Sequence, residues 1–329
     1  MRVLVDTTYT LRGPSGTATY LAGLVPALRE AGVDVVEVAN ERRRPPGTGS
    51  ARNWLADAAW VQRELARRAR TVGADVVHHP LPAHARAART AQVITVHDLA
   101  FERLPEAFDR RYAAWARRAH RAAARRADAV VCPTEATARD VRARWGVPAA
   151  RVVVAPHGPG AAAAGGAAGA RAAPLPLRRR RRAAQEPGGA AGRARPATAS
   201  ARSARSRSSS PGPRGCPWAP SAWPALYAGA AAVVHAALHE GFGLTLAEAM
   251  RAGVPVLAGR SPGVVETAGD AALYADPRDP EDLARALERL AADAALRAAL
   301  SERGRSRAGR LSWAGSARAH ISAYTLALG

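Results

Sequence analysis

Two glutamates on either side of a glycine-rich turn are the residues of this chain best suited to act on a ligand. Glu240 and Glu248 are separated by seven residues, the first four of which are Gly241, Phe242, Gly243 and Leu244. The glycines remove side chains where the backbone turns, so that free N–H groups of the next helix can face outward. Such a helix start favours a phosphate, because its donors and its dipole act together. A helix start that binds nothing is the simpler alternative.

Two other loops follow strands that we expect from the pattern of apolar residues. Gly16 ends a Gly-Pro-Ser-Gly turn after the first strand, and His97 begins a His-Asp-Leu segment after a strand at 93–96. Ligands of open parallel sheets bind beyond the carboxyl ends of strands. The simpler alternatives are a glycine that only turns the chain and an ordinary loop histidine. His78 and His79 also end a strand, and we interpret them as a loop pair because no third ligand has zinc-like spacing.

These loops belong to a pattern in which short apolar runs alternate with longer amphipathic stretches, which is typical of parallel α/β domains. Before residue 157 we expect strands at 2–6, 33–38, 76–79, 93–96, 129–132 and 151–155. The helices between them are expected at 16–31, 54–72, 110–126 and 135–145, with a loop at 7–15. After residue 224 we expect strands at 231–235, 254–257 and 272–274, and late helices at 279–291, 293–309 and 313–327.

The composition limits the possible classes of protein. A chain of 329 residues can form two domains. Its formal charge is +21, and all 48 of its basic residues are arginine. This bias suggests a GC-rich genome more than a nucleic-acid surface. Two cysteines, no apolar run of about 18 residues and no signal-peptide layout favour a cytoplasmic location. Peripheral association with the inner face of the membrane is the alternative location.

The segment 158–223 differs from the rest. It is rich in arginine, alanine, glycine and proline, and twelve arginines but only one acidic residue, Glu186, lie between Arg171 and Arg214. By composition alone it is a disordered basic linker or a nucleic-acid arm. It contains almost no aromatic residue for base stacking before Trp218 and no recognisable binding module, so we expect no nucleic-acid partner.

The block from Glu240 to Val256 resembles the donor-site signature of the family 4 retaining glycosyltransferases, also described as glycosyl transferases group 1. The His97 segment, with Phe101, Leu104 and Pro105 after it, is similar to that family's substrate-contacting histidine segment. The resemblance covers about 1–157 and 224–329. It implies an α/β GT-B fold with two Rossmann-like domains facing across a cleft: an acceptor-side domain at 1–157 and a nucleotide-sugar domain at 224–312. Residues 313–329 would form a helix that crosses back to the first domain.

The resemblance also implies the activity and the roles of single residues. The chain would transfer a hexose, mannose among the candidates, from a nucleoside-diphosphate-sugar to a hydroxyl of a glycan or lipid-linked acceptor, with retention, in polysaccharide or glycolipid biosynthesis. His97 and Glu240 would contact the transferring sugar. Gly16 and the turn from Gly241 to Leu244 would contact the donor, and Glu248 would bind its ribose. No metal and no cofactor beyond the nucleotide-sugar co-substrate are expected.

The chain departs from the family between the two regions that resemble it, 1–157 and 224–329. A Val-Gly turn and an Arg-Asn-Leu segment, whose cation would hold the donor diphosphate, are missing there. One choice of codons for 177–187, read one base later, yields both segments, so we hypothesise that about 160–222 is translated out of frame. The second domain would then be incomplete. A catalytically inactive remnant and an arginine-rich nucleic-acid-binding protein are the alternative functions.

Overall fold

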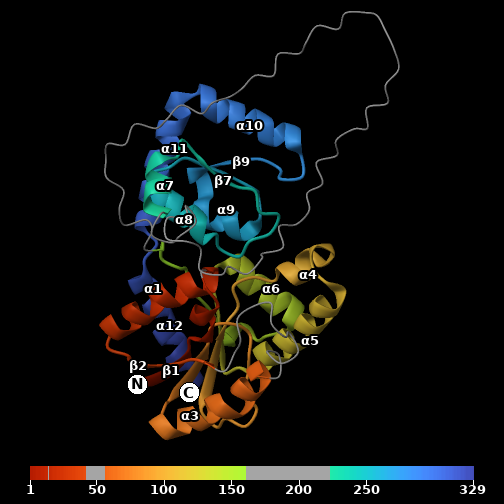
Figure 1. Cartoon of the computed structure of the whole chain (residues 1–329), viewed down its shortest axis with the longest axis vertical. Helices are drawn as coiled ribbons and strands as arrows, with labels where there is room; N and C mark the ends of the chain where they lie inside the picture. The colour runs from red at the N-terminus through yellow and green to blue at the C-terminus, as the bar shows by residue number, and fades with distance from the viewer. Residues whose placement is uncertain (14, 42–55, 161–222) are drawn as a thin grey trace, which may run out of the picture.

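The chain forms two separate parallel β-sheets, each covered by helices, in the computed structural model (Figure 1). The structure describes residues 1–13, 15–41, 56–160 and 223–329. The out-of-frame hypothesis for 160–222, the arginine-rich segment and the missing diphosphate-binding segment therefore lie outside the described residues, apart from Gly160.

The first sheet contains six strands in the order β2-β1-β3-β4-β5-β6, and all neighbouring pairs are parallel. Its strands are β1 Arg2–Asp6, β2 Asp34–Val38, β3 Val76–His79, β4 Ala91–Thr95, β5 Ala129–Cys132 and β6 Val152–Val154. Apolar residues alternate between its two faces: Val3 and Val5 belong to one core cluster, and Leu4 belongs to another. Both faces are buried because helices lie on both sides, as parallel strands require.

Helices α1 Gly16–Glu30 and α12 Trp313–Leu328 cover one face of this sheet. The other face carries the π-helical turn Trp60–Glu64 with α3 Leu65–Val72, and then α5 Arg110–Arg126 and α6 Glu135–Trp145. Side-chain oxygens cap several helix starts and satisfy N–H groups that have no partner within the helix. Ser15 caps α1, Asp109 caps α5, and Thr134 caps α6.

The second sheet contains three parallel strands within the described residues, β7 Val233–His235, β8 Val256–Ala258 and β9 Ala272–Tyr274. Its helices are α7 Trp223–Gly229, α8 Leu244–Arg251, α9 Pro262–Ala268, α10 Pro280–Ala292 and α11 Ala294–Gly309. Leu246 and Met250 of α8 are fully buried in the main core of this unit, and Leu290 of α10 and Leu300 of α11 fill a second core cluster.

Several expected boundaries need correction. The strand expected at 93–96 starts at Ala91 and ends at Thr95, because its pairing with β3 begins at the Val76–Ala91 register. The expected loop at 7–15 contains a 3-10 helix, Thr8–Arg12, whose start is stabilised by Asp6. Two short helices, α4 Ala100–Arg103 and the 3-10 turn Pro105–Ala107, were not predicted.

His78 and His79 are not loop residues. Both belong to β3, and their side chains are at most 1% exposed. His78 Nδ1 lies 2.8 Å from the Tyr324 hydroxyl, and the hydroxyl of Tyr20 lies 2.7 Å from His320 Nε2 and 2.9 Å from the Thr95 hydroxyl. Buried polar groups are stable only when they are hydrogen-bonded, and here these bonds join α1, β3 and β4 to the last helix, α12.

The buried histidines make stability depend on pH. Burial lowers the pKa of His320 to about 4, against 6.5 for the free side chain, and it lowers the pKa of His78 well below 6.5. Between pH 6.5 and 4 the unfolded chain therefore binds more protons than the folded chain, so stability falls as pH falls. We expect urea denaturation to show about 1.4 kcal/mol lost per pH unit for each such histidine. In His320→Asn the slope of the unfolding free energy against pH should fall by the share of one histidine, about 1.4 kcal/mol per pH unit. An unchanged slope would contradict the assignment of this pH dependence to His320.

Candidate functional site

The two units meet where the glycine-rich turn of the second lies against the histidine loop of the first. A β-carbon at Gly241 would lie 1.8 Å from the His97 carbonyl oxygen and 3.0 Å from Cβ of Asp98. Only glycine fits there. The Thr134 hydroxyl donates a 2.8 Å hydrogen bond to the Gly241 carbonyl from the opposite element, α6. The residue pattern singled out His97 and this turn separately, and the structure brings them into contact.

Glu240, directly before the turn, is half-buried, and the backbone N–H groups of the three residues that follow it lie near its carboxylate. Burial raises the pKa of Glu240 and the nearby Asp98 carboxylate raises it further, whereas the three N–H groups lower it. Its Oε2 lies 3.8 Å from Nε2 of His235, whose pKa is itself lowered by burial. The turn's N–H groups, which we expect to bind a ligand, lie near the Glu240 carboxylate in this structure.

Glu248, one turn into α8, is only 8% exposed. Its Oε2 accepts a 2.8 Å hydrogen bond from the Tyr227 hydroxyl, and the carboxylate also accepts the Gly160 N–H. Burial raises the pKa of Glu248, and these two donors oppose that shift. A β-carbon at Gly160 would lie 2.1 Å from Oε1, so only a glycine lets the backbone of the first unit reach this carboxylate.

His97 lies half-buried at the carboxyl end of β4, and its Nδ1 is 3.3 Å from Nε2 of His157. The His157 ring is 2% exposed, packs 5.0 Å from the Phe242 ring, and stacks at 5.7 Å on Trp313 of α12. Burial lowers the pKa of both histidines. Both are therefore neutral at pH 7, and each can donate one hydrogen bond and accept another.

The remaining candidate residues also lie along this contact. Gly16 begins α1, and a β-carbon there would be 4.0 Å from Cδ1 of Leu244, the first residue of α8. The first turns of helices from the two units therefore face each other. Gly243 caps α8 with φ of 85°, a left-handed conformation that glycine adopts without strain.

The Glu266 carboxylate joins the two units at a second point. It accepts the N–H groups of Glu135 and Ala136, at 2.6 and 2.8 Å, at the start of α6. Two charge-assisted bonds to a helix N-terminus combine hydrogen bonding with the helix dipole. Arg307 donates to the Glu266 and Thr267 carbonyls and so holds the end of α9 that carries this carboxylate.

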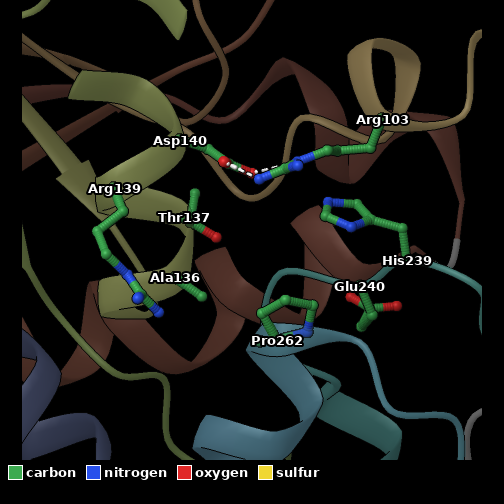
Figure 2. Close-up of a pocket in the computed structure, with 9 residues that line it drawn as sticks. Arg103, Ala136, Thr137, Arg139, Asp140, His239, Glu240 and Pro262 are labelled. Atoms are coloured by element: carbon green, nitrogen blue, oxygen red, sulfur yellow. Dashed lines mark hydrogen bonds and ion pairs between the residues drawn. The ribbon is translucent and has the colours of Figure 1, made fainter. Parts of the chain in front are cut away.

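A cavity of about 200 Å³ opens beside Glu240 between the two units (Figure 2). Arg103 and Asp140 form an ion pair at its edge, with Nε 3.0 Å from Oδ2. Figure 2 shows Arg139 and Thr137 of α6 on one side and His239 and Glu240 on the other. Its lining comprises Arg103, Ala136, Thr137, Arg139, Asp140, His239, Glu240, Pro262 and Gly263.

This arrangement can bind an anion and hydroxyl-bearing groups. The start of α8 offers N–H donors, and the carboxylates of Glu240 and Glu248 offer acceptors. Neutral His97 and His157 can each supply a donor and an acceptor. No group of three or more histidine, cysteine or acidic side chains placed to hold a metal ion occurs in the described part of the chain. Nor do the described helices include one long and apolar enough to cross a membrane.

Sequence reasoning missed three residues that complete the site. His157 lies three residues beyond the end of β6, much as His97 lies two residues beyond β4, so the rule that ligands gather at strand ends could have found it. Two interactions gave no comparable signal: the hydrogen bond from Tyr227 to Glu248, and the bonds from the start of α6 to Glu266 of α9. In each case the residue pattern does not indicate the partner.

The sequence matches two protein families. Residues 14–159 match Glycosyltransferase Family 4, and residues 218–307 match Glycosyl transferases group 1. The O-antigen chain mannosyltransferase B of Escherichia coli is 37% identical over 103 residues, which is 31% of this chain and 27% of that protein. The chain thus spans about a quarter of the length of the curated relatives it matches.

Solved structures resemble the whole fold. The sucrose-phosphate synthase of Thermosynechococcus elongatus aligns with a TM-score of 0.69 at 16% identity, over 99% of this chain and 98% of that one. Anabaena HepE in complex with UDP and glucose aligns with a TM-score of 0.56 at 16% identity, over 98% of each chain. At these identities the likeness concerns the fold alone. The fold is GT-B, and the expectation from the sequence is confirmed.

The Glu266 bonds should stabilise the closed contact between the two units. Glu266→Ala leaves two N–H groups at the start of α6 without an acceptor, which costs about 1–3 kcal/mol. We expect lower stability in urea and a larger radius of gyration by small-angle X-ray scattering. Glu302→Ala, which removes an exposed ion pair within α11, is the matched control and should change neither quantity. Equal behaviour of the two variants would contradict the role of Glu266.

Proposed function

This chain belongs to the group 1 glycosyltransferases with a family 4 N-terminal region, and on that premise we propose that it transfers a sugar from a nucleoside-diphosphate-sugar to an acceptor hydroxyl, with retention. The observation that carries the proposal is the contact of the Glu240 turn with the His97 loop. This contact brings Glu240, His97 and the start of α8 close to one another, and Glu240 also lines the neighbouring cavity.

The donor would bind along the second unit, with its diphosphate at the start of α8. To receive the N–H groups of the turn, the diphosphate must replace the Glu240 carboxylate, which then becomes free to accept a sugar hydroxyl. Glu248 would bind the ribose, since a carboxylate accepts two hydrogen bonds from a diol. The UDP and glucose held by Anabaena HepE support a donor of this class.

Catalysis by such a site is mainly positioning and stabilisation of charge. A diphosphate is already a good leaving group, and negative charge grows on it as the glycosidic bond breaks. The helix dipole of α8 and the N–H groups of the turn stabilise that charge where water is excluded. Glu240 would hold the donor sugar, and neutral His97 would orient a hydroxyl without adding charge. We propose no metal and no further cofactor.

The acceptor would enter through the cavity beside Glu240. We propose a hydroxyl of a glycan or of a lipid-linked sugar, in polysaccharide or glycolipid biosynthesis, and a hexose such as mannose as the transferred sugar. The similarity to an O-antigen mannosyltransferase supports this class. Several charged side chains line the cavity, and Arg139 at its edge forms no ion pair with any of the described residues, so it can receive an acceptor's anionic group.

Glu248 can be tested by nucleotide binding alone. We expect calorimetry with UDP, GDP and ADP to identify one nucleotide diphosphate that binds, and Glu248→Ala to weaken it about tenfold or more, because the ribose loses a charged acceptor. Tyr227→Phe keeps the carboxylate and should retain most of the affinity. Unchanged affinity in Glu248→Ala would refute the ribose assignment. If the wild type binds none of the three, the chain is better described as an inactive remnant.

Glu240 should affect transfer more than binding. Glu240→Gln keeps the size of the side chain but removes the charge, so nucleotide affinity should change by less than about threefold while the transfer rate falls about a hundredfold or more. The measurement is sugar transfer to a glycan acceptor, beside calorimetry on the same preparation. Glu281→Gln, an exposed acid on α10, is the control. Transfer at the wild-type rate would exclude Glu240 from the reaction.

A further inference from the structure

Helix α5 carries an unusual outer face along the flank of the first unit, beside α4 and α6 (Figure 1). Its sequence holds seven arginines and no acidic residue. Tyr112 and Trp115 are 45% and 44% exposed, although both are large aromatic residues. The buried side is made of alanines, Ala113, Ala116, Ala123 and Ala124, so the large side chains lie outside the core.

The described residues supply no carboxylate partner for the charge on this face. None of their carboxylates lies within ion-pair distance of the arginines in the first twelve residues of α5, Arg110, Arg111, Arg117, Arg118 and Arg121. Asp109, directly before the helix, accepts the Tyr112 N–H as its cap. Arg111 and Arg118, four residues before and three after Trp115, are its neighbours on the helix surface.

The aromatic rings support one another. Phe108 stacks on Tyr112 at 6.1 Å, Tyr112 lies 6.0 Å from Trp115, and Trp115 meets His120 edge to face at 5.6 Å. Because the Tyr112 and Trp115 rings are tilted by 42° and Trp115 meets His120 at 72°, they do not form a parallel platform for nucleic-acid bases. A Trp and a Tyr with apolar bodies, polar edges and flanking arginines suit the boundary between lipid tails and headgroups.

The aromatic end of α5 lies close to the reaction centre. Asp98 links them: it touches Gly241, its Oδ1 accepts the Ala100 N–H at the start of α4, and α4 packs on α5. The Asp98 carboxylate also raises the pKa of both Tyr112 and Glu240, after burial as the larger cause. A surface seated on α5 is therefore adjacent to the contact between the two units.

We propose that the face of α5 bearing Arg111, Tyr112, Trp115 and Arg118 docks on an anionic lipid surface. The arginines bind lipid phosphates, since basic residues near an anionic membrane surface are attracted to it. The two aromatic side chains insert at headgroup depth, as interfacial anchors do. Docking sets the cavity beside Glu240 next to the membrane, where a lipid-linked acceptor would be presented. This last step rests on the proposed function, whereas the docking itself does not.

The test is vesicle flotation of the full chain. We compare phosphatidylcholine vesicles with vesicles that also contain phosphatidylglycerol, at low and high salt. The wild type should float only with the anionic vesicles and should be released by salt. Arg111→Glu/Arg118→Glu and Tyr112→Ser/Trp115→Ser should each weaken binding about tenfold or more. Arg285→Glu/Arg289→Glu on exposed α10, with the same change in charge, should float like the wild type.

The outcomes separate the possible explanations. Equal flotation of the wild type and both α5 variants would overturn the proposal and would point to other basic residues, among them the twelve arginines between 171 and 214. Displacement of the protein from vesicles by RNA, with RNA binding lost in the α5 variants, would identify a nucleic-acid surface instead. Nucleotide binding by calorimetry should be unchanged in the α5 variants, so loss of docking and failure of the donor site can be told apart.

Discussion

The structure of the site depends on a steric constraint: the backbone of one unit approaches the backbone of the other with no room for a side chain. At Gly241 a β-carbon would collide with the His97 carbonyl, and at Gly160 it would collide with the Glu248 carboxylate. Within the second unit, a β-carbon at Gly263 would meet the Glu240 and Gly241 carbonyl oxygens at 2.5 and 2.4 Å, so this glycine lets α9 approach the turn. Gly241 and Gly160 thus permit the contact between the units, and the polar groups around them stabilise it.

Several polar groups at this contact have a partner across it: Glu266 satisfies the start of α6, Thr134 binds the Gly241 carbonyl, and the Gly160 N–H lies at the Glu248 carboxylate. Nε2 of His97 and Nδ1 of His157 are buried there without a hydrogen-bond partner among the described residues. A nucleotide bound as we propose would compete with contacts within the second unit, since the N–H groups of the turn lie near Glu240 and Tyr227 holds Glu248. Ligand binding here would replace one set of hydrogen bonds with another, and its net free energy would be the difference between the two sets.

Much of the fold could be predicted from the sequence, because buried parallel strands and amphipathic helices give a local signal. The strand at Val76–His79 and the helices at Arg110–Arg126 and Glu135–Trp145 have the predicted bounds. Short elements such as α4 were missed, because four residues carry no periodicity. The site was predicted as separate loops. What could not be predicted is which groups meet, since Glu266 and Glu135 are 131 residues apart and nothing in either segment records the other.

The position of α12 has a consequence for how the protein is made. Tyr20 and His320 are 300 residues apart, yet their side chains hydrogen-bond inside the core of the first unit, and Tyr324 completes the same cluster. Helix α1 is made early, but the part of this face that α12 covers stays open until the last helix has been synthesised. A growing chain on the ribosome carries that apolar surface exposed through translation of the whole second unit. Contacts of such long range fold slowly, so chaperones and the rate of translation have time to act on this face before it is buried.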